Sequence, residues 1–340
     1  MSLMWFLMRR RTRYSLLLML ALMVALVVAL VLRKAAPPEA ARLLPESDAM
    51  VYANLKPLRA ATHFDRTPVT RNPDYQRFVD ATGIVPERDL DSAAFALHRM
   101  DDPNGPNGPV GYSEVFEGRF DGGRLASYLE TIATSKESYA GHDIYTIAVG
   151  DGKVTRPLRI AQLGYDTIAA SNMPTPEQIH SILDRHRAAA SPFSGSSLLS
   201  ERYRDVPAFS SAWAIGHIGL PFSDRGYISI FGLELPLPED TTFVASLRYL
   251  GTLHLRIEQI APSEADASKA TATLTSLLGL VKSVEKTEAQ MHPQAATDAE
   301  FQQLTDSAKI EQHKDRAVLT ANIPLDLVKK LTTPAVEAKP

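Results

Sequence analysis

The sequence predicts a mixed α+β protein that is held at a membrane by one N-terminal helix. Three observations lead to this expectation: an uncharged apolar run over residues 15–32, alternating apolar and polar residues typical of strands in the rest of the chain, and amphipathic helical segments between those strands. We expect the part after the anchor to form two related halves, each a mostly antiparallel sheet with helices packed on one face.

The composition is that of a folded protein. The 340 residues are 45% hydrophobic and 22% charged, and the 23 prolines and 18 glycines are spread along the chain instead of gathering in tracts. The chain has no cysteine, which excludes disulfide frameworks, thiolate metal sites and cysteine nucleophiles.

The apolar run at residues 15–32 is 18 residues long. A helix of that length spans about 27 Å, enough to cross the hydrocarbon core of a bilayer. Basic residues flank the run on both sides, with Arg9, Arg10, Arg11 and Arg13 before it and Arg33 and Lys34 after it. This excess before the run predicts that the N-terminus stays in the cytoplasm and that the bulk of the chain lies outside. A signal peptide cleaved after Ala36 or Ala41 is the alternative, and the length of the run favours an uncleaved anchor.

Domain boundaries follow from these features. We expect a basic cytoplasmic leader at 1–14, the transmembrane helix at 15–32, a stiff stalk at 33–46, the two halves at 47–205 and 206–333, and a disordered tail at 334–340. The first 34 residues hold five arginines, one lysine and no acidic residue, so a whole-chain charge of −3 leaves −9 for the remainder. This acidic remainder argues against nucleic-acid binding, and the expected partners are the bilayer and a protein, which can be a second copy of the chain.

The elements of the first half are predicted from local patterns. Strands are expected at 49–55, 93–99, 112–120, 144–149, 158–163 and 167–170, with a turn-rich loop at 101–109. Helices are expected to begin at Pro73, after the capping residue Asp121, at Thr175-Pro176 and at Ser197. Thr175 to Gln178 read as a capping box with proline at the first helical position.

The second half shows a similar mixture. Strands are expected at 209–218, 228–233, 241–249, 252–260, 309–313 and 317–323, and helices after Ser263, at 298–308 and at 325–331. The segments 51–55, 115–120 and 319–323 resemble one another, and they suggest a repeated unit.

The predicted hairpin at 241–260 supplies the candidate contact surface. Leu253, Leu255 and Ile257 are expected to face the core, while alternate residues face solvent or a partner. The candidate contact residues on that polar face are Arg248, His254, Arg256 and Glu258.

A family resemblance rests on short motifs spread over most of residues 43–331. These motifs are Leu44-Pro45 with Tyr52, Phe120-Asp121, Tyr139-x-Gly141 with Ile144-Tyr145, and Ser263-Glu264-Ala265. In this order, after an N-terminal anchor, the chain resembles uncharacterised bacterial membrane-anchored envelope proteins that contain a domain of unknown function. The resemblance implies an extracytoplasmic α+β scaffold in bacteria, and it carries no catalytic residues. Together with the predicted anchor and its charge bias, this leads us to expect a protein of the bacterial cytoplasmic membrane with its bulk in the periplasm.

Catalytic and metal-binding motifs are absent from the sequence. The nine histidines include no His-Glu-x-x-His pair, and His180 and His186 lie on different faces of one predicted helix. The four oxygen-bearing side chains within residues 101–109 depart from the calcium-binding pattern and are typical of turns. Ser283 and Lys286 match Ser-x-x-Lys without its partner motifs. We therefore expect no catalytic residue, metal or cofactor.

The sequence favours a non-enzymatic structural or protein-interaction module of the envelope. Two alternatives stay open: a small-molecule binding module with its cleft between the two halves, and a hydrolase that uses a serine or aspartate outside any known motif.

Overall fold

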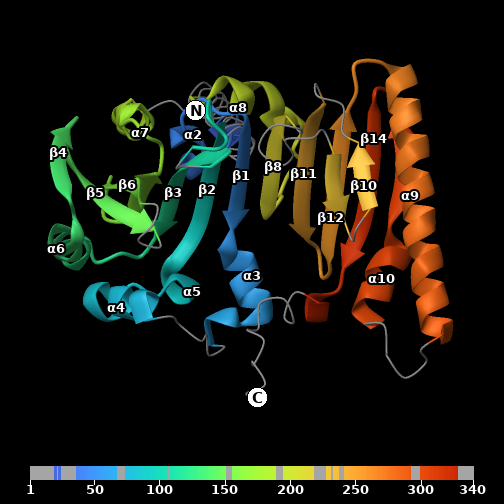
Figure 1. Ribbon diagram of the computed structural model, residues 1–340, viewed down its shortest axis with the longest axis horizontal. Helices are drawn as coiled ribbons and strands as arrows, with labels where there is room; N and C mark the ends of the chain where they lie inside the picture. The colour runs from blue at the N-terminus through green and yellow to red at the C-terminus, as the bar shows by residue number, and fades with distance from the viewer. Residues whose placement is uncertain are drawn as a thin grey trace, which may run out of the picture.

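Most of the chain after residue 35 is described by the computed structural model. The described residues are 19–20, 22–23, 36–66, 73–105, 108–150, 155–188, 194–217, 227–230, 233–236, 241–291 and 299–327. Within them, twelve strands form one antiparallel sheet and two more form a separate hairpin (Figure 1). The protein is thus a mixed α+β protein built on a large antiparallel sheet, as the sequence predicts.

The large sheet is a single sheet that contains strands from both expected halves of the chain. From edge to edge it contains β13 (Lys309–His313), β14 (Arg316–Ile323), β12 (Leu253–Ile260), β11 (Thr242–Tyr249), β8 (Ala212–His217), β1 (Ala49–Asn54), β2 (Leu90–Arg99), β3 (Val110–Gly118), β7 (Thr167–Ser171), β6 (Thr155–Gln162), β5 (His142–Gly150) and β4 (Ser135–Tyr139). The separate hairpin pairs β9 (Tyr227–Ile230) with β10 (Leu233–Pro236). The antiparallel pair β1–β8 joins the two halves at the middle of the sheet.

The same order of elements occurs on both sides of the β1–β8 pair. Outward from β1 lie β2, β3 and β7, and outward from β8 lie β11, β12 and β14. When β1 and β8 are counted as the first strands, a helix follows the third strand on each side: α6 (Gly122–Ile132) follows β3, and α9 (Glu264–Met291) follows β12. The similar segments 51–55, 115–120 and 319–323 lie mainly in β1, β3 and β14. These three strands do not occupy corresponding positions in the two halves.

Helices cover both faces of the sheet, so the expectation of one covered face is wrong. On β5, Ile144 lies in the core under α2 (Glu39–Leu43), α7 (Glu177–Arg187) and α8 (Ser197–Arg202). The next residue, Tyr145, packs on the opposite face with Leu125 and Leu129 of α6 and with Phe78 of α4 (Pro73–Thr82). Neighbouring residues of a strand point to opposite faces of the sheet. Because both faces are apolar here, the alternation of apolar and polar residues did not indicate a face exposed to solvent.

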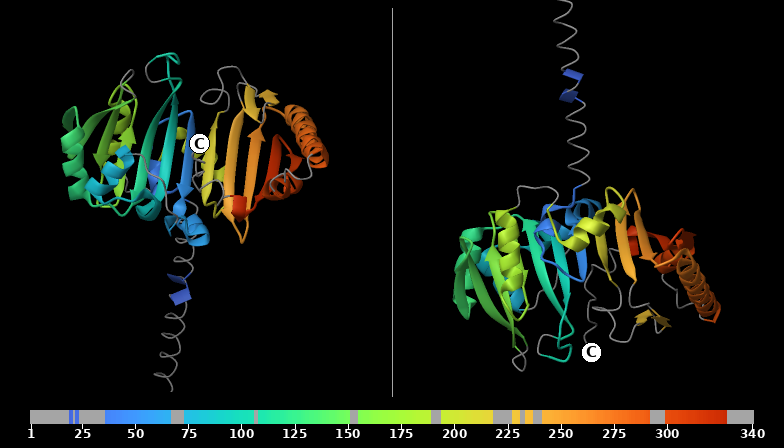
Figure 2. Two further views of the ribbon diagram at one scale, coloured as in Figure 1. Left: turned by 60° about the horizontal axis from the view of Figure 1, so that its bottom comes forward. Right: turned by 90° about the horizontal axis from the view of Figure 1, so that it is seen from above.

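The remaining helices are short, with three to nine residues each. These are α3 (Leu55–Thr62), η1 (Phe64–Arg66), α5 (Pro86–Asp89), η2 (Tyr203–Asp205) and α10 (Ala299–Ser307). The helix α9 runs along the β13 edge of the sheet (Figures 1 and 2). Its expected row of core-facing residues is shallow, since Ala267 is buried while Val284 is 56% exposed.

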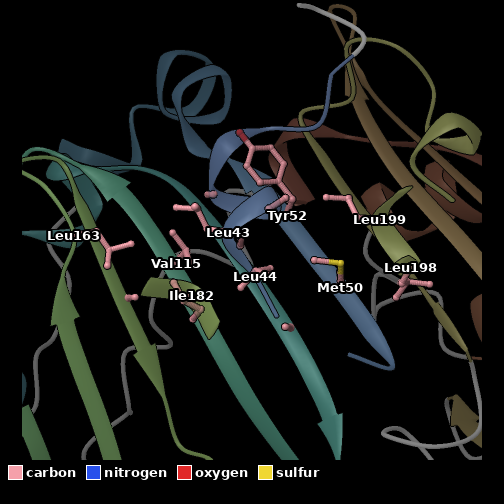
Figure 3. Packing of buried hydrophobic residues seen from close by; sticks show 14 of the residues in the cluster. Leu43, Leu44, Met50, Tyr52, Val115, Leu163, Ile182, Leu198 and Leu199 are labelled. Carbon is pink, nitrogen blue, oxygen red and sulfur yellow. The ribbon is translucent and has the colours of Figure 1, made fainter. Parts of the chain in front are cut away.

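The core under α2 contradicts the expected stalk. Residues 33–46 were expected to form a stiff linker, but Ala40, Ala41, Leu43 and Leu44 are buried against the sheet. Figure 3 shows Leu43 and Leu44 beside Met50 of β1 and Val115 of β3. Burying apolar side chains of this size stabilises a fold by roughly 1.5–3 kcal/mol each. Residues 40–44 are therefore part of the folded domain and do not form a linker.

Two predicted helix caps, those at Asp121 and Ser263, are confirmed, and the third is wrong. The Asp121 side chain accepts a hydrogen bond from Arg124 N at 3.1 Å, and Ser263 Oγ accepts one from Asp266 N at 3.1 Å. In α7, Pro176 occupies the cap position and makes no side-chain cap hydrogen bond, so the expected capping box does not form. In addition, α3 and β4 formed where the sequence predicts neither a helix nor a strand, and residues 328–331 of the expected last helix lie outside the described residues.

Candidate functional site

The four predicted contact residues lie along β11 and β12. Arg248 and His254 are directly opposite one another in the register, and Arg256 and Glu258 follow on β12 at alternate positions. They therefore share one face of the sheet. That face is the one covered by α2, because Tyr52, Trp213, Ser246 and Arg256 are directly opposite one another in successive strand pairs.

The prediction that Glu258 faces solvent is wrong. Glu258 as a whole residue is 4% exposed. Its carboxylate accepts a hydrogen bond from Arg256 Nε at 2.7 Å and another from Arg316 Nη1 at 2.8 Å. Arg316 Nη2 also donates to Asp205 Oδ1 at 2.9 Å. The side chains of Glu258 and Asp205 are 6% and 10% exposed. We call these four residues, Arg256, Glu258, Arg316 and Asp205, the buried ionic network.

Electrostatics favour the charged form of Arg316. The hydrogen bond with Glu258 raises the pKa of Arg316 above its ordinary value, with Asp205 adding to the effect and burial opposing it. A buried carboxylate is costly to desolvate unless opposite charge and hydrogen bonds compensate it, and here Glu258 receives both from two guanidinium groups.

Three elements bring the network together. Glu258 is paired in register with Val318, so Arg316, two residues earlier on β14, reaches the same face. Asp205 ends η2, which is held over the sheet because Tyr203 contacts Trp213 edge-on at 5.5 Å between ring centroids. Trp213 in turn stacks on Tyr52, with 5.6 Å between the ring centroids. We call the contact between the halves at β1 and β8 the seam, and these aromatic contacts at the seam position Asp205.

An open pocket of about 770 Å³ lies over the buried ionic network. Its lining residues come from η2, β12 and the β13–β14 turn: Arg204, Asp205, Arg256, Glu258, Gln312, His313, Lys314, Asp315 and Arg316. Four of these residues are basic and three are acidic, so the lining carries a net charge of +1 with His313 neutral. This sign is opposite to that of the acidic chain after residue 34.

The unused hydrogen-bonding groups of the pocket are mainly donors. Among the described residues, no hydrogen bond or ion pair involves the side chain of Arg204 or Lys314, or the terminal nitrogens of Arg256. One acceptor is also unused, because Asp205 Oδ2 is buried without a hydrogen-bond partner. The lining contains no serine, threonine or cysteine, and the imidazole of His313 pairs with Glu311 at 3.4 Å. The arrangement suits binding of a charged group.

Sequence reasoning identified Arg256 and Glu258 but missed their partners. Arg316 lies on an alternating strand, which the sequence predicts, but nothing local indicates that β14 pairs with β12. Asp205 lies at the end of the first half, and only the fold places it beside residues of the second. The other two predicted contact residues stay outside the pocket, where His254 Nε2 lies 3.1 Å from Thr252 Oγ1.

The histidines of α7 both contact the β4–β5 hairpin. His180 stacks on Tyr139 with ring centroids 3.8 Å apart, and His186 lies 5.6 Å from His142. Among the described residues, no group of three or more potential metal ligands is close enough to hold an ion.

Two other candidate motifs of the sequence, the loop at 101–109 and Ser283, form hydrogen bonds with near neighbours in the chain. Asn104 N donates to Asp102 Oδ1 at 3.1 Å, a contact of the turn in the loop 101–109. Ser283 Oγ donates to Gly279 O at 2.8 Å within α9.

The predicted membrane anchor falls largely outside the described residues. So do its basic flanks, namely Arg9, Arg10, Arg11, Arg13, Arg33 and Lys34. Four residues of the run are described; Met19, Leu20, Leu22 and Met23 are helical and 53% to 64% exposed. Within the described part of the chain, no helix combines the length and apolar character needed to cross a bilayer.

Comparison with known proteins gives structural similarity at low sequence identity. No protein-family description matches the chain, and neither does any characterised protein. Crystal form III of a protein named TP0453 has a TM-score of 0.49 and 11% identity, covering 88% of this chain and 99% of that one. Form IV has a TM-score of 0.45 and 9% identity, covering 87% and 96% of the two chains. Form I has a TM-score of 0.44 and 8% identity, covering 86% and 96%.

Proposed function

We propose that this protein is a single-pass, membrane-anchored module of the bacterial envelope. Its α+β domain lies outside the cytoplasm and acts without catalysis, by supporting structure or by binding a protein, which can be a second copy. The observation that carries this proposal is the uncharged run at residues 15–32 with its excess of basic residues on the N-terminal side.

Two structural features support the anchor. The four described residues of the run expose apolar side chains, which is costly in water and favourable in lipid. The folded domain begins at α2, only a few residues after the run, and α2 packs on the face that also carries the charged pocket. An anchored domain would therefore be held close to the bilayer by that face.

Topology is tested by a fusion behind Pro340. We expect alkaline phosphatase fused there to be active in cells, because that enzyme folds only outside the cytoplasm, and green fluorescent protein fused there to be dark. The reverse pattern contradicts the proposed orientation. Replacing Arg9, Arg10, Arg11 and Arg13 by glutamine removes the charge bias, so more molecules should insert in the opposite orientation.

The repeated order of elements supports the proposal of two related halves. Each half would be a sheet with a helix after its third strand, joined through β1 and β8. The charged pocket favours a second candidate function, small-molecule binding, because Arg204 and Asp205 end the first half while the rest of the lining belongs to the second. Thermal unfolding of the full chain in detergent, with and without candidate ligands, tests this function; stabilisation by a ligand supports it.

A further inference from the structure

We propose that the charged pocket binds a phosphate group through Arg204, Arg256 and Lys314. This inference deepens the second candidate function, since it names the chemical class that the pocket accepts. It is independent of the membrane anchor except for the origin of the phosphate, which can be a soluble phosphate ester or a phospholipid headgroup.

Charge pairing inside the pocket leaves positive charge unused. Glu258 is satisfied by two guanidinium groups, and Arg316 is occupied by Glu258 and Asp205. Within the described chain, no partner is seen for the ammonium group of Lys314 or the guanidinium group of Arg204. An anion that enters the pocket can therefore pair with Arg204 and Lys314 without breaking an existing ion pair.

The buried network also fixes one of the three cations. Arg256 donates through Nε to Glu258 at 2.7 Å, and its side chain is 32% exposed. Its two terminal nitrogens remain for a ligand. A guanidinium group held in this way loses little conformational entropy on binding an oxyanion.

The positions of the cations favour a tetrahedral oxyanion. Arg204 belongs to η2, Arg256 to β12 and Lys314 to the β13–β14 turn, where its φ of 56° places it in the left-handed region. A planar carboxylate is satisfied by one bidentate arginine, whereas phosphate presents oxygens in more than one plane and can use donors from several sides. The pocket of about 770 Å³ is also large enough for the organic part of an ester.

The placement of the pocket explains why a lipid headgroup is one of the two sources. Arg256 lies on the sheet face that α2 covers, and α2 is where the described domain begins. A bilayer holding residues 15–32 would therefore lie on the side of the pocket.

The test uses the full chain in nanodiscs of phosphatidylcholine, titrated calorimetrically at pH 7 and 0.15 M salt. The probes are inorganic phosphate, sn-glycerol 3-phosphate and dihexanoyl phosphatidylglycerol. We expect binding that falls at least tenfold in the double variant Arg204→Gln/Lys314→Gln. Both side chains are exposed and outside the buried ionic network, so folding should be unchanged, which thermal unfolding verifies.

The matched control is Arg187→Gln/Lys309→Gln, which removes two exposed cations from outside the pocket and should keep the wild-type affinity. Preference for glycerol 3-phosphate supports a soluble ester, and preference for the phosphatidylglycerol diester supports a headgroup. Absence of binding to all three probes, or equal loss in the two double variants, overturns the proposal. The reporter fusions test the anchor separately, so failure of one proposal is distinguishable from failure of the other.

Discussion

Arg316 Nη1 lies 2.8 Å from Glu258 Oε2, and this contact joins β14 to a side chain of β12 that is 6% exposed. The same guanidinium group contacts Asp205 at the end of the first half. A single side chain thus links the two halves of the chain beneath the charged pocket.

Removing that side chain should destabilise the protein. Arg316→Ala leaves Glu258 buried with Arg256 as its remaining partner, and leaves Asp205 buried without any cation. We expect a loss of about 2–3 kcal/mol in the free energy of unfolding, below the roughly 3–5 kcal/mol for a fully buried pair, because Arg316 is 28% exposed and Arg256 still pairs with Glu258. Urea unfolding followed by circular dichroism measures it.

A surface ion pair provides the control. Arg77 pairs with Asp74 three residues earlier on α4, and the two side chains are 76% and 83% exposed. Arg77→Ala should therefore cost less than about 0.5 kcal/mol. Equal effects of the two substitutions would show that the network contributes no more than a solvated pair.

A second prediction concerns Glu114 on β3. Its register partners are Phe95 and Ala170, and burial raises the pKa of its carboxyl group from 4.5 to about 7. Between these two values the folded state keeps a proton that the unfolded state releases. The free energy of unfolding should therefore fall as pH rises from about 4.5 to 7, and level off above that range.

Glu114→Gln should remove this fall. At pH 8 the variant should be more stable than the wild type by up to about 3 kcal/mol, because each pKa unit corresponds to about 1.4 kcal/mol. Unfolding measured at intervals from pH 4.5 to 8 tests this. Glu177→Gln, at an exposed position of α7, is the control and should keep the wild-type pH dependence. Parallel profiles for Glu114→Gln and the wild type would refute the assignment.

The third prediction concerns the seam between the halves. Trp213 is 3% exposed and contacts both Tyr52 and Tyr203. Trp213→Ala should cost about 3–5 kcal/mol, the range for removing a large aromatic side chain from a core. Because β1 and β8 lie in one continuous sheet, we expect both halves to lose stability together.

Proteolysis resolved by mass spectrometry follows the two halves separately during thermal unfolding. The control Tyr165→Ala removes a side chain that is 83% exposed, and it should change stability by less than about 0.5 kcal/mol. Unfolding of the second half alone in Trp213→Ala would contradict the idea of a shared seam.

Local patterns predicted much of the secondary structure. The hairpin of β11 and β12 formed as expected because Gly251 adopts a φ of 87° at its turn and apolar residues alternate along β12 from Leu253 to Ile257. Asp121 and Ser263 were found because a cap is a contact between near neighbours. Such signals need no knowledge of distant segments.

Pairings between distant segments explain what the sequence did not reveal. The burial of Glu258 depends on Asp205 and on Arg316, which lies 58 positions away. A charged residue on a strand ordinarily indicates solvent, and this expectation fails when another strand and a short helix supply its partners. Likewise, Ala40 and Leu43 read as part of a linker until β1, β2 and β3 provide a surface for them.

The central claim is that the folded domain lies outside the cytoplasm, tethered by residues 15–32. The chain has no cysteine, so a cysteine placed at one position reports the location of that position alone. Intact cells would be treated with a charged maleimide that does not cross the cytoplasmic membrane. We predict that Tyr165→Cys, at a site 83% exposed, is labelled, while Ser2→Cys is labelled only after lysis. Labelling of Ser2→Cys in intact cells, with Tyr165→Cys protected until lysis, would contradict the account.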